Sequence, residues 1–260
     1  MLKNYCNKLS IISSSNTMIK KDINIKTLDG TMNSFVVYPD EGGPFPLVLF
    51  LMDAPGKREE LHDMAIRLST CGYYVMLPNL YYRRTKDFIL DRTPQENREK
   101  MYEHMFSLTN SMVLNDIKKM IEISKNDNNV NDGPIGAIGY CMSGPFVFYA
   151  ASRLNNVIKS TASIHGVRLF TEDNDSPHLN SENINGEIYF AIAEHDEHVP
   201  LEMIEKLDKS LSSKNINYRI EIFRNTEHGF VFRRRGKKYS KVDAEIKWNR
   251  VISMFDRNLR

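Results

Sequence analysis

A cysteine between small residues is the first candidate for a reactive group. Residues 135–145 read Ile-Gly-Ala-Ile-Gly-Tyr-Cys-Met-Ser-Gly-Pro, so an apolar run ends in a glycine-flanked turn that contains Cys141. This pattern is typical of a nucleophile elbow, a strained turn between strand and helix, with cysteine where serine is more common. The backbone N–H of Met142 would then point at an oxyanion. The alternative interpretation is an inert, buried cysteine.

Two later segments carry groups that could assist this thiol. Residues 194–200 read Glu-His-Asp-Glu-His-Val-Pro, and residues 225–230 read Asn-Thr-Glu-His-Gly-Phe. The order Cys141, acid, His228 is the order of nucleophile, acid and histidine in α/β-hydrolases. In this interpretation His228 takes the thiol proton and returns it to the leaving group, and the acid fixes the imidazole tautomer. The alternative is a capped surface histidine.

Three acids compete for the third position. Asp196 is favoured over Glu194 and Glu197, because it stands at the tip of the turn before Pro200, where a short carboxylate can reach a neighbouring loop. The other two then belong to a solvated turn. The same segment, with its alternating His and acid residues, could also be a metal cluster, but no further Cys or His set supports one. We therefore expect no metal.

Hydrophobic periodicity places these groups at the ends of predicted strands. A β-hairpin is predicted over residues 22–38, because two alternating segments flank Asp29-Gly30. Buried strands are expected at 47–52, 73–77, 135–140, 157–164, 187–193 and 218–223. Helices are expected at 59–70, 95–125 with a break near 107–111, 143–154, 201–213 and 239–259. This alternation predicts an α/β fold, a mostly parallel doubly wound sheet that opens with the antiparallel hairpin. Its active groups would lie at the carboxyl ends of the strands.

Composition narrows the class of protein. A net charge of +2 over 260 residues gives no reason to expect nucleic acid or a membrane surface as partner. No apolar run approaches the length of a membrane span. Three distant cysteines argue against a disulfide framework and suit a reducing, cytoplasmic location. We expect one domain over residues 22–260 after a flexible extension, residues 1–21, although a transit peptide stays open for the latter. Monomer and small homo-oligomer both remain open.

The chain resembles the dienelactone hydrolase family of α/β-hydrolases. The matching motifs are residues 139–144, 195–200 and 228–230, with further matches at 53–56 and 72–81, and the resemblance covers about residues 22–255. It implies the α/β-hydrolase fold, a triad of Cys141, Asp196 and His228, and no cofactor. It also implies an oxyanion hole formed by the backbone N–H groups of Met142 and Ala54. Members of the family hydrolyse lactones and small esters.

The chain departs from the family pattern at several positions around the expected pocket. Asp53 stands where the family has a glutamate that pairs with the resting thiol. Because Asp53 is one methylene shorter, whether it reaches Cys141 stays open, and the alternative is an aspartate that caps the turn. Arg83 matches one family arginine that binds a substrate carboxylate. The second is displaced, because Phe232 occupies its position and Arg233 follows. His165 stands where the family usually has an aromatic residue, and either lines the pocket or ends a strand.

These residues predict a hydrolase that cleaves a lactone or small carboxylic ester through an acyl-enzyme. The expected substrate is a small molecule, one that carries a carboxylate if Arg83 and Arg233 bind it. Two alternatives stay open. One is a thiol-dependent hydrolase of another acyl substrate, such as a thioester. The other is a catalytically inactive binding protein on the same fold.

Overall fold

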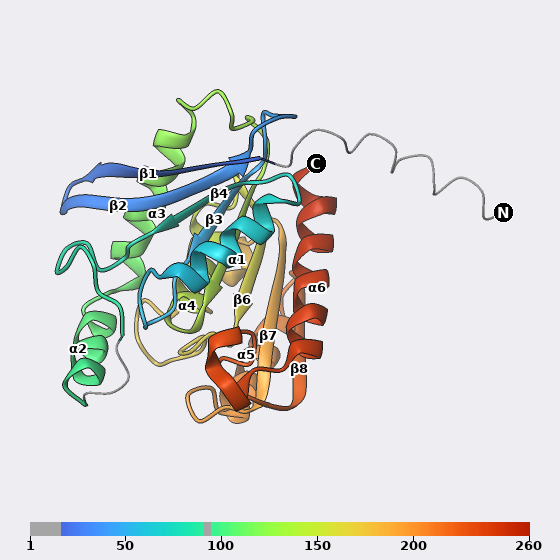
Figure 1. Cartoon of the computed structure of the whole chain (residues 1–260). Coiled ribbons are helices and arrows are strands. Elements are labelled where there is room, and N and C mark those ends of the chain that lie inside the picture. Colours follow the sequence, from blue (N-terminus) through green and yellow to red (C-terminus); the bar gives the residue numbers. More distant parts are fainter. Residues whose placement is uncertain (1–16, 91–94) are drawn as a thin grey trace.

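An eight-stranded sheet forms the centre of the protein (Figure 1), and the computed structural model describes residues 17–90 and 95–260. The strand order is β1-β2-β4-β3-β5-β6-β7-β8. The strands are β1 (Met18–Thr27), β2 (Gly30–Pro39), β3 (Leu47–Leu51), β4 (Tyr74–Pro78), β5 (Ile135–Tyr140), β6 (Ile158–Ile164), β7 (Glu187–His195) and β8 (Asn217–Glu227).

Strand direction confirms the predicted architecture. β1 and β2 form an antiparallel hairpin, and β2 pairs antiparallel with β4. All the remaining neighbours, from β4 to β8, are parallel. Every residue of β3, β4 and β5 is buried, which is why these strands read as continuous apolar runs in the sequence.

The first strand begins earlier than predicted. β1 starts at Met18, where it pairs with Pro39, and Lys21 pairs with Val36. Residues 18–21 therefore belong to the sheet, and the predicted boundary at residue 22 is wrong. Backbone pairing with β2 decides this boundary, because the side chains of residues 18–21 do not alternate clearly between polar and apolar. Residues 1–16 of the predicted extension lie outside the described residues.

Two layers of helices cover the sheet. Helices α1 and α6 lie on one face, and α3 and α4, which pack on each other, lie on the opposite face (Figure 1). Helix α2 stands off the sheet at the lower left of Figure 1. The α-helices are α1 (Glu59–Ser69), α2 (Gln95–Phe106), α3 (Asn110–Ser124), α4 (Gly144–Arg153), α5 (Leu201–Ser212) and α6 (Lys241–Leu259). Short 3₁₀ segments are η1 (Cys141–Ser143), η2 (Ser181–Asn183) and η3 (Arg233–Lys238).

The predicted break in the long helical stretch is confirmed. Helix α2 ends at Phe106, and Thr109 begins α3 by accepting a hydrogen bond from the Met112 N–H at 3.2 Å. Among the described helices, none is both long enough and apolar enough to cross a lipid bilayer.

Candidate active site

The turn after β5 has the strained geometry of a nucleophile elbow. Cys141 has a φ of 52°, in the left-handed region that costs a non-glycine residue roughly 1–3 kcal/mol. A Cβ on Gly139 would lie 2.2 Å from the Ser143 carbonyl oxygen, and one on Gly144 would lie 2.4 Å from the Gly166 Cα. The small residues therefore permit this close packing, and the partly buried Cys141 stands at the start of η1.

His228 and Asp196 meet across neighbouring loops. Asp196 follows β7 and His228 follows β8, and these two strands pair in parallel, so their carboxyl ends lie side by side. His228 Nδ1 and Asp196 Oδ2 are 2.6 Å apart, and the Asp196 side chain is fully buried. Asp196 also accepts a hydrogen bond from the His198 N–H at 2.9 Å, which holds the turn. The carboxylate is thus placed to orient the imidazole.

The charge state of His228 depends on Cys141. Burial lowers the pKa of His228, but attraction to the Cys141 thiolate and hydrogen bonds with Asp196 and Cys141 outweigh it and raise the pKa to about 10. A cysteine beside an imidazole that a carboxylate orients is the arrangement of groups that thiol hydrolases use.

Two further imidazoles pack against His228. His165 lies edge-on to it with ring centroids 4.6 Å apart, and His198 does so at 5.0 Å. Burial and the charge of His228 lower the pKa of both rings, and that of the fully buried His165 lies well below its usual value. Both rings are therefore neutral beside a charged His228. No described residue gives either ring nitrogen of His165 a hydrogen bond.

A tyrosine that the sequence analysis missed links the two expected oxyanion residues. Tyr81 Oη donates to the Ala54 carbonyl oxygen at 2.9 Å and lies 3.2 Å from Met142 Sδ. Ser143 Oγ donates to the Met52 carbonyl oxygen, so the elbow is also tied to the end of β3. These contacts fix Ala54 relative to Met142. Tyr81 lies within the motif at 72–81, which offered a signal for it.

Cys141 and His228 face a cavity of about 410 Å³, which we call the Cys141 cavity. Cys141, His228 and Ala54 line it, and α2 supplies much of the opposite wall. Its charged lining residues are Arg98, Arg168, Glu197, Arg235 and Lys238. Positive charge exceeds negative charge in this lining, so the cavity favours an anionic small molecule. Among the described residues, no group of His, Cys, Asp or Glu side chains has the arrangement to hold a metal ion.

Comparison with known proteins agrees with this geometry. The sequence profile of the dienelactone hydrolase family matches residues 32–259. The chain belongs to the dienelactone hydrolase family. A crystal structure of a provisionally named dienelactone hydrolase from Klebsiella pneumoniae has a TM-score of 0.82 at 19% identity, covering 93% of this chain and 100% of that one. This likeness confirms the α/β-hydrolase fold.

Curated relatives of this dienelactone hydrolase family member share its length. A Synechocystis sp. protein provisionally named a carboxymethylenebutenolidase is 24% identical over 231 residues, 87% of this chain and 92% of that protein. A carboxymethylenebutenolidase from Pseudomonas putida is 24% identical over 136 residues, 52% of this chain and 57% of that protein.

The sequence leaves open whether Asp53 pairs with the thiol, and the structure gives Asp53 a different partner. Both carboxylate oxygens of Asp53 accept hydrogen bonds from Arg58, one of them at 3.2 Å from Nη2. Asp53 is fully buried and does not line the Cys141 cavity. Arg58, five residues downstream, therefore holds this carboxylate in the loop between β3 and α1.

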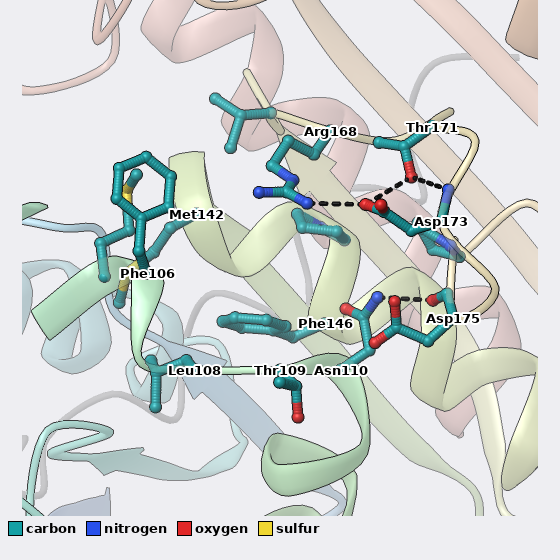
Figure 2. A pocket seen from close by; sticks show the side chains of 14 residues that line it. Phe106, Leu108, Thr109, Asn110, Met142, Phe146, Arg168, Thr171, Asp173 and Asp175 are labelled. Carbon is teal, nitrogen blue, oxygen red and sulfur yellow. Dashed lines mark hydrogen bonds and ion pairs between the residues drawn. The ribbon is translucent and has the colours of Figure 1, made fainter. Parts of the chain in front are cut away.

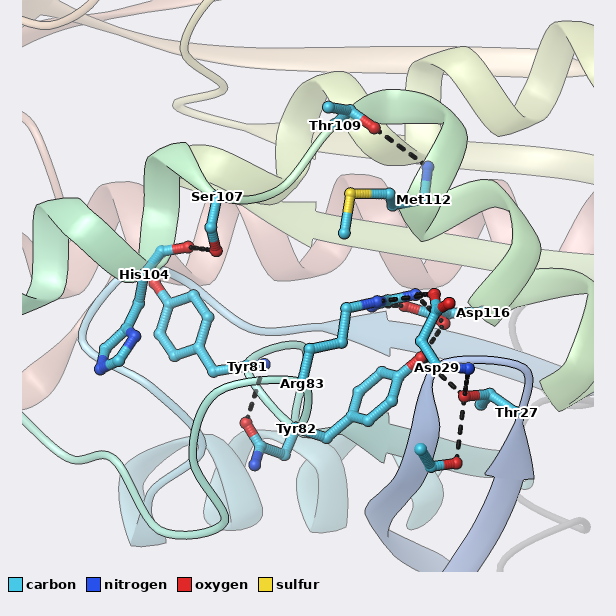
Figure 3. A network of polar contacts seen from close by, with 12 residues as sticks. Thr27, Asp29, Tyr81, Tyr82, Arg83, His104, Ser107, Thr109, Met112 and Asp116 are labelled. Atoms are coloured by element: carbon cyan, nitrogen blue, oxygen red, sulfur yellow. Dashed lines mark hydrogen bonds and ion pairs between the residues drawn. The ribbon is translucent and has the colours of Figure 1, made fainter.

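Arg83, expected to contact a substrate carboxylate, binds two carboxylates of the protein instead. Its guanidinium donates to both oxygens of Asp116 at 2.8 and 2.9 Å and to Asp29 at 2.8 Å (Figure 3). Asp116 lies on α3 and Asp29 in the hairpin turn, so Arg83 ties three segments together. With both carboxylates bound, Arg83 is committed to structure and does not line the Cys141 cavity.

The other two expected pocket residues also lie elsewhere. Arg233 lines a separate cavity of about 380 Å³ beside Trp248, because the 3₁₀ turn η3 directs Arg235 and Lys238 toward Cys141 instead. His165 is buried behind His228 and does not line the cavity. The order of residues 233–238 does not by itself show which of these basic side chains faces the cavity, because that depends on the path of η3.

Proposed function

We propose that this protein hydrolyses a carboxylic ester or lactone through Cys141, His228 and Asp196. The observation that carries the proposal is the 2.6 Å contact between His228 Nδ1 and the buried carboxylate of Asp196, with His228 and Cys141 lining the same cavity. Membership of the dienelactone hydrolase family supports this chemistry. So does the name carboxymethylenebutenolidase, which its relatives carry.

In the proposed reaction, the Cys141 thiolate attacks the substrate carbonyl carbon and forms a C–S bond. The backbone N–H groups of Met142 and Ala54 would stabilise the oxyanion, each donor being worth about 10²–10³ in rate. As the C–O bond breaks, the leaving oxygen takes the proton of His228. Water then gives its proton to His228 and attacks the thioester, which releases the acid and restores the thiolate. Asp196 keeps the imidazole in position throughout.

We further propose that the substrate is a small anion, one that bears a carboxylate, and that the protein works in the cytoplasm. The positive lining of the Cys141 cavity supports the first point, with Arg98, Arg235 and Lys238 taking the place expected for Arg83 and Arg233. A thiol nucleophile must stay reduced, which supports the second.

The direct test is hydrolysis of 4-nitrophenyl acetate by Cys141→Ala. We expect kcat/KM to fall by at least about 10³-fold, because the variant lacks the group that forms the acyl-enzyme. Cys71→Ala is the matched control and keeps wild-type activity, since Cys71 lies at the end of α1, outside the residues that line the Cys141 cavity. Full activity in Cys141→Ala would reject the proposed nucleophile.

A further inference from the structure

A second cavity adjoins the Cys141 cavity. It has a volume of about 300 Å³, and we call it the Phe146 cavity after the ring at its centre (Figure 2). The two cavities share four wall residues, which are Met105, Phe106, Val167 and Arg168. The two cavities therefore adjoin along these four side chains, and we refer to them as the two arms of the site.

The two arms differ in charge. Away from the shared wall, the Phe146 cavity combines apolar side chains with carboxylates, which Figure 2 shows on opposite sides of Phe146. Of the two carboxylates, Asp173 is bound to Arg168 at 2.7 Å, which neutralises this arginine, and Asp175 is half-buried. Its apolar residues beyond the shared wall are Leu108, Met142, Pro145, Phe146 and Pro177. The Phe146 cavity therefore repels an anion, whereas the Cys141 cavity attracts one.

The positions of the reacting groups assign the arms. His228 lines the Cys141 cavity alone, and the leaving oxygen must lie next to His228 to receive its proton. Of the two expected oxyanion donors, Ala54 lines the Cys141 cavity and Met142 lines the Phe146 cavity, so the reacting carbonyl lies where the two arms meet and the arm away from His228 is left for the acyl part. The part of the substrate that stays on the sulfur therefore points toward Phe146, and the part that leaves points toward the cations.

Within the proposed function, we propose that the Phe146 cavity binds an uncharged, apolar acyl group of an ester whose alcohol part is anionic. At roughly the 30 Å³ that one water occupies in the liquid, the cavity has room for up to about ten non-hydrogen atoms. In the reaction this acyl group forms the thioester with Cys141 and then leaves as the free acid. The anionic alcohol takes the His228 proton and departs through the Cys141 cavity. Arg235, whose Nε is buried and finds no hydrogen-bond partner among the described residues, is the first candidate to hold the anion.

The first test compares 4-nitrophenyl acetate with 4-nitrophenyl hexanoate. Each buried methylene adds up to about fourfold to kcat/KM, so wild-type enzyme should prefer hexanoate by one to two orders of magnitude. Leu108→Trp, which fills the Phe146 cavity, should reduce the hexanoate-to-acetate ratio at least tenfold. Leu28→Trp is the control, since Leu28 is fully exposed in the hairpin turn, and it should leave the ratio unchanged.

The second test reverses the charge at Asp175 in the Phe146 cavity. Wild-type enzyme should discriminate at least tenfold against the 4-nitrophenyl monoester of adipic acid relative to the hexanoate ester, because the carboxylate would lie beside Asp175. Asp175→Arg should reverse most of that discrimination. Asp132→Arg, at the opposite edge of the sheet before β5, should leave it unchanged.

The third test concerns the alcohol arm. Arg235→Gln should lower kcat/KM for 3-carboxyphenyl hexanoate at least tenfold more than for phenyl hexanoate. Lys209→Gln on α5 is the control and should affect both esters equally.

The outcomes separate the two proposals. If Cys141→Ala hydrolyses 4-nitrophenyl acetate as fast as wild type, the proposed function fails. If Cys141→Ala is inactive but neither Leu108→Trp nor Asp175→Arg changes the acyl preference, the function stands and the assignment of the Phe146 cavity is overturned. An equal effect of Arg235→Gln on both phenyl esters would overturn the assignment of the alcohol arm.

Discussion

Two buried aspartates lie at the carboxyl ends of parallel strands and pair with different kinds of residue. Asp196 follows β7 and Asp53 follows β3, and both side chains are fully buried. Asp196 pairs with His228, whose ring lines the Cys141 cavity, whereas Asp53 pairs with Arg58, which does not line it. In the proposed reaction, a buried carboxylate therefore contributes only where its partner reaches the reacting atoms. Otherwise the same kind of pair fastens a loop.

Of the predicted substitutions, Asp196→Asn should lower kcat/KM the most. Asp196→Asn keeps the shape but removes the charge that orients and supports imidazolium, so kcat/KM should fall by about 10²–10⁴-fold. In the wild type, the raised pKa keeps His228 protonated up to about pH 10. Losing the Asp196 interactions lowers that pKa, so the alkaline limb of the kcat/KM profile should move to lower pH. An unchanged rate and profile would remove Asp196 from the triad.

Asp53→Asn should lower the stability of the folded protein rather than its activity. Asp53→Asn leaves Arg58, whose side chain is 13% exposed, with Glu60 at 3.0 Å as its remaining carboxylate partner, beside its hydrogen bond to the Gly56 carbonyl oxygen at 3.2 Å. Breaking one side of a buried ion pair costs about 3 kcal/mol, or roughly 6–12 °C in Tm for a domain of this size. We expect kcat/KM of the folded variant to change less than about tenfold. A variant as inactive as Asp196→Asn but with wild-type Tm would instead assign Asp53 a role in the reaction.

Lys247 is a buried basic residue that, unlike Arg58, has no carboxylate partner among the described residues. Lys247 is fully buried, with its Nζ 3.4 Å from Tyr140 Oη and 3.3 Å from the centre of the Trp248 ring. No described carboxylate lies within ion-pair distance of it. Burial, with the charge of Arg67, holds the pKa of Lys247 well below its ordinary value of 10.5. Lys247→Met should therefore stabilise the protein by roughly 1–3 kcal/mol at neutral pH.

The stabilisation expected for Lys247→Met depends on pH, because the folded and unfolded states bind the Lys247 proton with different affinity. Below pH 10.5 the unfolded chain binds a proton at Lys247 that the folded protein binds more weakly. The free energy of unfolding of the wild type therefore gains from this residue as pH rises toward 10.5, and the advantage of Lys247→Met shrinks over the same range. Urea titrations between pH 7 and 10 measure this, with exposed Lys209→Met as the control. A constant difference between Lys247→Met and wild type would contradict the account.

The sequence predicted those parts of the site that depend on residue spacing and on the order of strands along the chain. The elbow around Cys141 follows from glycine spacing, and the places of Asp196 and His228 follow from strand ends and chain order. The parallel sheet and its opening hairpin follow from hydrophobic periodicity. Each of these depends on residues close together in the chain or on the rule that parallel strands share one carboxyl edge.

Contacts between residues far apart in the chain determine which arginines face the cavity, and the sequence alone did not reveal these contacts. Arg83 is held by Asp116, 33 residues away, and this partner on α3 turns a predicted substrate contact into a structural one. Arg235 lines the Cys141 cavity and Arg233 does not, because residues two apart in a 3₁₀ turn point in different directions, and η3 then kinks at Gly236, with a φ of 59°, before Lys238. In such a run of like residues, the path of the backbone determines which side chain faces the substrate.

The rate of iodoacetamide labelling at each cysteine tests the central claim most directly. Cys71 is a suitable internal reference, because burial raises the pKa of its thiol and keeps it protonated at neutral pH. Peptide mass spectrometry reads each cysteine separately. We predict that Cys141 in the wild type reacts at least about tenfold faster than Cys71 at pH 7, and that His228→Ala removes this advantage. Equal rates at Cys141 and Cys71, or a fast Cys141 that does not depend on His228, would contradict the account.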